Sequence, residues 1–134
     1  MEPKDTLIVI PAYNEELHIA NTIHNIISEI NKNKLQKNID LLVIDDCSTD
    51  KTTEILYTLN IHVISNLKHL GYASSLQVGY RYAVGQNYNY VIQMDSDGQH
   101  DASNITSLYT EIHKNKCDIV LGNRYVHSDI KTTK

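Results

Sequence analysis

The stretch VIQMDSDGQHD, residues 91–101, joins an apolar, β-rich run to a series of polar side chains. Acidic or amide residues then stand at alternate positions: Asp95, Asp97, Gln99 and Asp101. A strand that is buried on both faces has a continuous apolar sequence, and in open α/β sheets the ligand-binding residues follow such strands at their carboxyl ends. This stretch therefore predicts a buried strand that ends in a ligand-binding loop.

Similar apolar runs alternate with helical patterns along the whole chain. The runs are TLIVI (6–10), LLVI (41–44), HVIS (62–65), YVIQM (90–94) and DIVL (118–121). Apolar residues at helical spacing fall in 20–30, 76–83 and 105–112, and a shorter helix fits 51–59, with Asp50 and Ser103 as N-caps and Gly85 as a helix end. Strict alternation of strand and helix predicts an α/β fold with a largely parallel sheet and helices on both faces.

Composition sets limits on the class of protein. The chain has 134 residues, of which 41% are hydrophobic, and a net charge of −4 without a basic cluster. These values predict one globular domain over residues 1–134 and no nucleic-acid partner. Cys47 and Cys117 show neither disulfide nor zinc spacing. Without a signal-peptide pattern or an apolar run of about 18 residues, we expect a cytoplasmic chain with no transmembrane segment.

Polar segments follow the predicted strands at positions that would meet at one edge of the sheet. They are PAYNEE (11–16), DDCSTD (45–50), DSDGQHD (95–101) and GNRY (122–125). Each segment alone is compatible with a turn or a helix cap. Four such segments at the carboxyl edge of one sheet instead predict a binding site.

The DSD portion of the opening stretch is suited to a divalent cation. Asp95 and Asp97 can direct hard oxygen ligands at one ion, but two or three protein oxygens are too few for a calcium cage. They fit Mg²⁺ or Mn²⁺ that is shared with a diphosphate. An EF-hand loop is excluded because His100 replaces the required Gly and Thr106 the required Glu. The glycine patterns of Rossmann and P-loop phosphate sites are also absent from the sequence.

Five segments together resemble one family. PAYNEE, VIDDCSTDKT, HLGYASSLQVGYRYA, MDSDGQHD and LGNRY occur in the order and spacing typical of inverting family 2 glycosyltransferases. The resemblance covers residues 6 to 126 and is strongest with the polyisoprenyl-phosphate sugar transferases, the dolichol-phosphate mannose synthase group. It implies a GT-A nucleotide-diphospho-sugar transferase fold.

The resemblance also implies roles for individual residues. Pro11, Tyr13 and Glu15 would line the nucleotide pocket, Asp46 would contact the base, and Ile44 would flank it. Asp95, Asp97 and Gln99 would bind the metal, with Asp95 and Asp97 catalytic and Ser96 close to the ribose or phosphates. Arg124 would meet an acceptor phosphate, for which a guanidinium is suited by bidentate pairing. Tyr72 stands where many relatives carry a basic residue or Gly, which puts a charged contact there in doubt.

The implied reaction transfers a sugar from a UDP- or GDP-sugar to a polyprenyl phosphate or another acceptor, with the enzyme peripheral to a membrane surface. A lipid phosphate needs no general base, whereas a hydroxyl does. Catalytic domains that resemble this chain are longer, so we expect this segment to bind donor better than it transfers sugar. Two alternatives remain: a nucleotide-sugar-binding domain without catalysis, and a phospho-receiver signalling domain. The second is disfavoured because PAYNEE follows the first strand where an acidic pair should stand.

Overall fold

The computed structural model of the chain describes residues 4–98 and 100–122. Strands and helices alternate within these ranges, as the sequence predicts. The strands are β1 (Thr6–Ala12), β2 (Ile39–Asp45), β3 (His62–Ser65) and β4 (Tyr90–Gln93). The helices are α1 (Ile19–Lys32), α2 (Thr52–Thr58), α3 (Tyr72–Gly85) and α4 (Asn104–Ile112).

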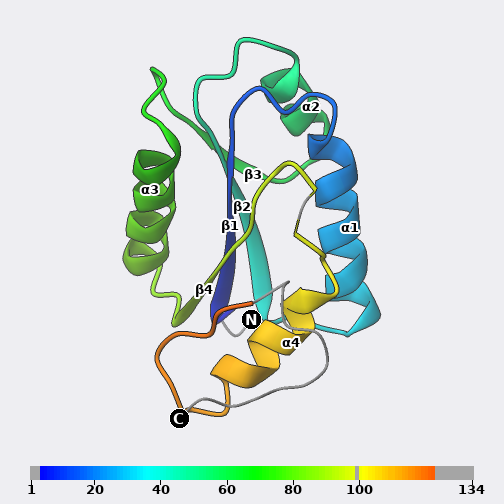
Figure 1. Cartoon of the computed structure of the whole chain (residues 1–134), viewed down its shortest axis with the longest axis vertical. Coiled ribbons are helices and arrows are strands. Elements are labelled where there is room, and N and C mark those ends of the chain that lie inside the picture. The colour runs from blue at the N-terminus through cyan, green and yellow to red at the C-terminus, as the bar shows by residue number, and fades with distance from the viewer. Residues whose placement is uncertain (1–3, 99, 123–134) are drawn as a thin grey trace.

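The four strands form one parallel sheet in the order β3-β2-β1-β4. Helix α3 covers one face, and α1, α2 and α4 lie on the other (Figure 1). The predicted parallel α/β architecture is therefore confirmed. From β1 the chain first builds the sheet toward β3 and then returns to the opposite side of β1 with β4. In open α/β sheets, ligands bind where the strand order reverses in this way.

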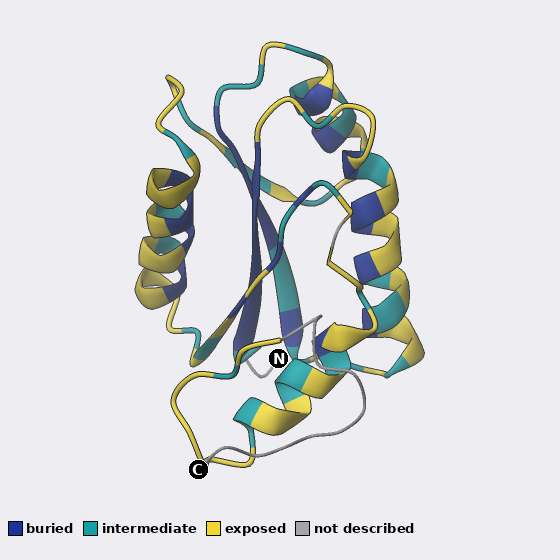
Figure 2. Cartoon of the chain, viewed as in Figure 1, coloured by how far each residue is buried: buried dark blue, intermediate teal, exposed yellow. Residues whose placement is uncertain are grey.

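Strand β1 is the centre of the core, and all seven of its residues are buried (Figure 2). Successive side chains of a strand point to opposite faces of the sheet. Ile8 and Ile10 therefore join the cluster under α1, whereas Leu7 and Val9 join the cluster under α3. A Cβ atom at Gly79 would overlap the side chain of Val9, so the absence of a side chain there lets α3 approach the sheet closely.

The strand predicted at 118–121 is wrong. These residues have no regular secondary structure, and Ile119 and Leu121 are exposed. A β-rich composition forms a strand only beside a partner that accepts its backbone hydrogen bonds, and within the described part of the chain this segment pairs with none of the four strands. The outer strands β3 and β4 are also less buried than predicted, because each has a neighbour on one side only.

The predicted helix caps are corrected in detail. Helix α2 begins after Lys51, and Asp50 accepts a hydrogen bond from the backbone N–H of Thr52 at 2.8 Å from just outside the helix. At α4, Ser103 is the N-cap residue but its side chain makes no capping bond, and Asp101 instead accepts from the backbone N–H of Ser103 at 2.9 Å. Among the described residues, no helix combines the length and the apolar character needed to cross a bilayer.

Candidate functional site

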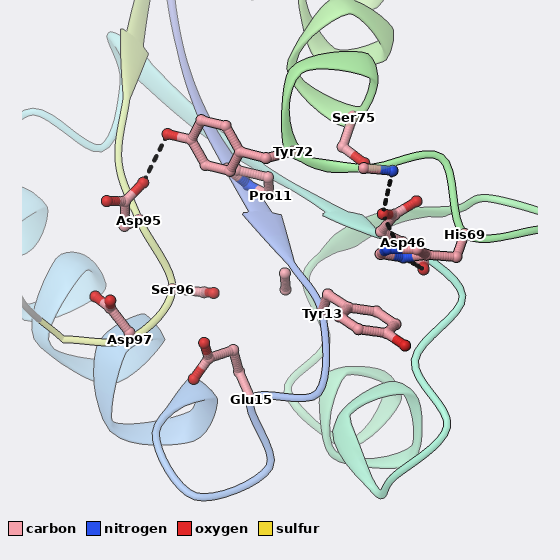
Figure 3. A pocket seen from close by; sticks show the side chains of 12 residues that line it. Pro11, Tyr13, Glu15, Asp46, His69, Tyr72, Ser75, Asp95, Ser96 and Asp97 are labelled. Atoms are coloured by element: carbon pink, nitrogen blue, oxygen red, sulfur yellow. Dashed lines mark hydrogen bonds and ion pairs between the residues drawn. The ribbon is translucent and has the colours of Figure 1, made fainter.

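A cavity of about 330 Å³ lies at the carboxyl edge of the sheet, around the ends of β1, β2 and β4. Seven of the residues predicted to form the site line it (Figure 3): Pro11, Tyr13, Glu15, Asp46, Asp95, Ser96 and Asp97. They come from three segments that are far apart in sequence. The fold thus brings together most of the predicted set at the point where the strand order reverses.

The remaining three predicted residues are not among the described residues that line the cavity. Ile44 is fully buried in the cluster under α3 and does not line the cavity, so the structure does not support its predicted place beside a base. Gln99 and Arg124 lie outside the described residues.

One end of the cavity is acidic. Glu15 and Asp97 both lie at this end, with Asp95 on the same loop as Asp97 (Figure 3). Burial raises the pKa of Glu15, and the negative charge of Asp97 raises it further. Repulsion between carboxylates of this kind is relieved when a cation binds between them.

The donor chemistry of this acidic end fits Mg²⁺ or Mn²⁺, because carboxylate oxygens are the ligands that these ions prefer. Within residues 4–98 and 100–122, however, no group of three His, Cys, Asp or Glu side chains is placed to hold a metal ion. A cation bound here would need further oxygen ligands from a substrate, as a diphosphate can provide.

Helix α1 holds the loop that carries Asp95 and Asp97. Ser96 is buried between the two aspartates, and its backbone carbonyl accepts a hydrogen bond from the hydroxyl of Thr22 at 3.1 Å. The backbone N–H of Met94 continues the ladder by donating to Val9 at 3.1 Å. The direction of the carboxylates is therefore set by a backbone that is tied to both the helix and the sheet.

Asp46 lies at the opposite end of the cavity, and groups of the protein itself donate hydrogen bonds to its carboxylate. Oδ1 accepts from the side-chain amide of Asn66 at 2.8 Å and from the backbone N–H of Leu70 at 2.8 Å. Oδ2 accepts from the backbone N–H of Gly71 at 2.9 Å and lies 2.9 Å from Nδ1 of His69. A carboxylate has about four lone-pair sites, and donors of the chain itself fill three of them, with His69 beside the fourth.

The titration of Asp46 reflects these contacts. Burial alone would raise its pKa, but the donors of Leu70, Asn66 and Gly71, helped by His69, outweigh burial and lower the pKa. The carboxylate therefore holds loop 66–71 in place. A base N–H could therefore reach Asp46 only at the oxygen beside His69, whose side chain is 53% exposed.

Two aromatic rings form a surface beside Asp46. The rings of Tyr13 and His69 lie 4.1 Å apart between centroids with a tilt of 36°, and both line the cavity. The ring of Tyr13 is partly exposed toward the cavity (Figure 3). Such a pair offers a flat, partly apolar face on which a planar base can stack.

The loop that carries Tyr13 and Glu15 is held by the loop after β2 and by the first residue of α2. Asn14 adopts a positive φ of 51°, and its side-chain oxygen accepts from the backbone N–H of Thr49 at 2.8 Å. The backbone N–H of Glu15 donates to the hydroxyl of Thr52 at 2.8 Å. These contacts between loops explain why PAYNEE and DDCSTD are both needed to build one site.

Five residues that line the cavity were not assigned to it by the sequence: Ala12, His69, Gly71, Tyr72 and Ser75. Ala12 is the last residue of β1, and the other four follow β3, whose carboxyl end carries no acidic run. The position of β3 could have indicated the residues that follow it, because β3 ends at the same edge of the sheet as the other three parallel strands.

Comparison with known proteins places the chain in a family. The model of glycosyl transferase family 2 matches residues 7–134. The chain is 32% identical over 123 residues to the dolichol-phosphate mannosyltransferase of Pyrococcus furiosus, covering 89% of this chain and 33% of that protein. The chain therefore spans 33% of the length of this relative. It spans 45% to 53% of the length of three other curated relatives that it matches.

Solved structures agree on the fold. TarS from S. aureus superposes with a TM-score of 0.65 at 23% identity, over 82% of this chain and 32% of that one. The mannosyltransferase PcManGT from Pyrobaculum calidifontis gives 0.58 at 21% identity, over 77% and 30%. These likenesses confirm the predicted GT-A glycosyltransferase fold, and the family match removes the phospho-receiver alternative. With a family model that spans nearly all of its length, this chain is a member of glycosyl transferase family 2.

Proposed function

We propose that this chain binds a nucleoside-diphosphate sugar, with a UDP or GDP moiety, and transfers the sugar with inversion to a polyprenyl phosphate or another acceptor. One observation carries the proposal: the acidic residues Asp95 and Asp97 and the aromatic residue Tyr13 line opposite ends of the same cavity. The base would stack at the aromatic end, and the diphosphate would lie toward the two aspartates.

The acidic end alone would repel a diphosphate, so the proposal includes Mg²⁺ or Mn²⁺. Asp95 and Asp97, together with Gln99, are the residues that would hold the ion. When bound, the cation neutralises the charge that develops on the departing diphosphate. Ser96, fixed between the aspartates, would pack against the ribose or phosphates.

In the reaction itself, the bond between the anomeric carbon and the diphosphate oxygen breaks as a bond to an acceptor oxygen forms on the opposite face of the sugar. A phosphate acceptor is already an anion and needs no general base. Arg124 is proposed to pair with such an acceptor phosphate. A hydroxyl acceptor would instead need a carboxylate to remove its proton.

The comparisons support this proposal through what is bound by similar proteins. PcManGT was crystallised with GDP-Man and Mn²⁺, and TarS with UDP. The names of relatives, including the dolichol-phosphate mannosyltransferase, point to lipid-phosphate acceptors.

The proposal is tested by calorimetric titration of the protein with UDP, GDP, CDP and ADP, in Mn²⁺ and in excess chelator. We expect UDP or GDP to bind preferentially, and much more tightly with the cation than in chelator. Asp97→Asn should weaken this binding by more than the roughly tenfold that loss of an outer-shell partner costs. The matched control is Asp118→Asn, which changes an exposed carboxylate near the amino end of β4 and should have no effect.

Equal affinity with metal and with chelator would remove the cation from the proposal. Turnover then separates a transferase from a binding domain without catalysis: release of sugar to polyprenyl phosphate supports transfer. Tight donor binding with no transfer to any acceptor by the full-length protein would favour the binding domain.

A further inference from the structure

The hydroxyl of Tyr72 links α3 to the acidic end of the cavity. Tyr72 is the first residue of α3, and its ring spans the cavity wall toward Asp95 (Figure 3). The hydroxyl oxygen lies 2.8 Å from Oδ1 of Asp95 and donates its hydrogen to that oxygen. A side chain whose role the family resemblance left in doubt thus contacts a carboxylate that the proposed function assigns to the cation.

The direction of this hydrogen bond is fixed by its neighbours. An ionised carboxylate only accepts hydrogen bonds, so the Tyr72 hydroxyl has to donate to Asp95. Its oxygen is then free to accept from the side-chain amide nitrogen of Gln93 at 2.9 Å. The amide oxygen of Gln93 in turn accepts from the hydroxyl of Tyr80, which lies further along α3.

These three hydrogen bonds form a series in which every donor points toward Asp95. Tyr80 donates to Gln93, Gln93 donates to Tyr72, and Tyr72 donates to Asp95. A tyrosine phenol ordinarily has a pKa of about 10, so the Tyr72 hydroxyl is protonated and a donor at neutral pH.

The second oxygen of Asp95 is also held. Nε2 of His100 lies 3.3 Å from Oδ2, and Nδ1 of His100 accepts from the backbone N–H of Asp95 at 3.1 Å. The Tyr72 hydroxyl on Oδ1 and the His100 ring beside Oδ2 together restrict rotation of the carboxylate. Both oxygens keep further lone pairs.

We propose that Tyr72 is a positioning residue that orients Asp95 toward the divalent cation, with Gln93 and Tyr80 fixing the direction of its hydroxyl. This inference rests on the proposed function, which places a cation between Asp95 and the donor diphosphate. Hydrogen-bond partners behind a metal ligand typically change metal affinity by 10–100-fold. The ring of Tyr72 also forms cavity wall, so the test has to remove the hydroxyl and keep the ring.

The test is Tyr72→Phe, assayed as the Mn²⁺ concentration that gives half-maximal UDP binding in calorimetry. We expect this concentration to rise about tenfold, the lower end of the usual range for outer partners. The midpoint of thermal unfolding and the residual UDP binding in chelator should stay unchanged. Tyr57→Phe, which removes an exposed phenol on α2 outside the cavity, is the matched control and should behave as wild type.

The outcomes separate this inference from the proposed function. If wild-type UDP binding needs Mn²⁺ and Tyr72→Phe has the same Mn²⁺ requirement, the positioning role is overturned and the proposed function stands. If binding in chelator falls by the same factor as binding in Mn²⁺, Tyr72 acts only as a wall and the inference is wrong. If wild-type binding is independent of Mn²⁺, both the cation and the positioning role are overturned.

Discussion

The two ends of the cavity use aspartates at strand ends in opposite ways. The Asp46 side chain is 4% exposed and is surrounded by donors of its own chain, whereas the Asp95 side chain is 33% exposed and keeps lone pairs available. Both follow parallel strands of the sheet, and both were predicted from sequence to contact the ligand directly. A carboxylate at the end of a strand can therefore either hold a loop of the protein or bind the ligand. Which of the two it does depends on whether a loop folds over it and donates hydrogen bonds to it.

The strongest test of this contrast is Asp46→Asn. The amide would present an N–H group to the donors that now meet the carboxylate, so loop 66–71 should lose its anchor. We expect the free energy of unfolding at pH 7 to fall by about 1.5–3 kcal/mol, the usual contribution of hydrogen bonds to a charged group. Urea denaturation measures this loss, with Asp118→Asn as the exposed control.

The pH dependence of the same variant sharpens the test. The folded-state pKa of Asp46 is lowered, so its contribution to stability is present above the usual value of 3.8 and is lost as the pH falls below that value. The gap between wild type and Asp46→Asn should therefore narrow in acid. Unchanged stability combined with weaker nucleotide binding would contradict this account and restore Asp46 as a direct contact to the base.

A smaller loss is expected from Gly71→Ala, which changes the backbone of the same loop. Gly71 has φ 95° and ψ 168°, a conformation that is almost restricted to glycine, while a Cβ atom would meet no other atom within 4 Å. The cost is therefore backbone strain alone, about 1–3 kcal/mol. Gly85→Ala at the end of α3 is the control, because it also has an open surrounding but no positive φ.

For this pair, thermal unfolding and UDP affinity should be measured together. Gly71→Ala should weaken UDP binding as well as stability, because the N–H of Gly71 holds Asp46 and the residue lines the cavity. Equal melting temperatures for the two variants would show that the loop tolerates a different backbone conformation.

The smallest effect on stability is expected at the acidic end, from Glu15→Gln. The pKa of Glu15 is raised, so ionised Glu15 lowers stability as the pH rises from its usual value of 4.5 through the folded-state value. The variant should gain less than about 1 kcal/mol at pH 7, since a partly exposed charge is screened by solvent. Its stability should also vary less between pH 4 and pH 7, as chemical denaturation would detect.

Donor binding by Glu15→Gln should move in the opposite direction. Removal of a negative charge beside Asp97 makes the cavity less attractive to a cation, so the Mn²⁺ requirement for UDP binding should rise. A variant that is less stable than wild type and binds the donor unchanged would remove Glu15 from the acidic end.

The sheet and most of the site were predictable from the sequence because both depend on local patterns. Continuous apolar runs identified β1 and β4, and the polar segments that follow these strands placed Glu15 and Asp97 at one edge of the sheet. The run at 118–121 has a similar composition but forms no strand, because pairing depends on a neighbour that composition does not reveal.

The roles of individual side chains were harder to predict than their location. Nothing in the letters around Asp46 indicates that the backbone of Leu70 and Gly71 folds back over it. His69 and Tyr72 were left without a role for a related reason, since their contacts depend on where α3 begins relative to the other loops. Such long-range closures are set by tertiary packing rather than by residue type.

The way loop 66–71 is anchored has a consequence for protein engineering. Its fixed points are Asn66 at one end and the N–H groups of Leu70 and Gly71 at the other, whereas the side chains of Leu67 and Lys68 between them are exposed. Random substitution at positions 67 to 69 would vary His69, which lines the cavity, and its two exposed neighbours, while Asp46 still holds both ends of the loop. A combinatorial library confined to these three codons is therefore a compact route to altered donor preference, because most of its members should keep the parental fold.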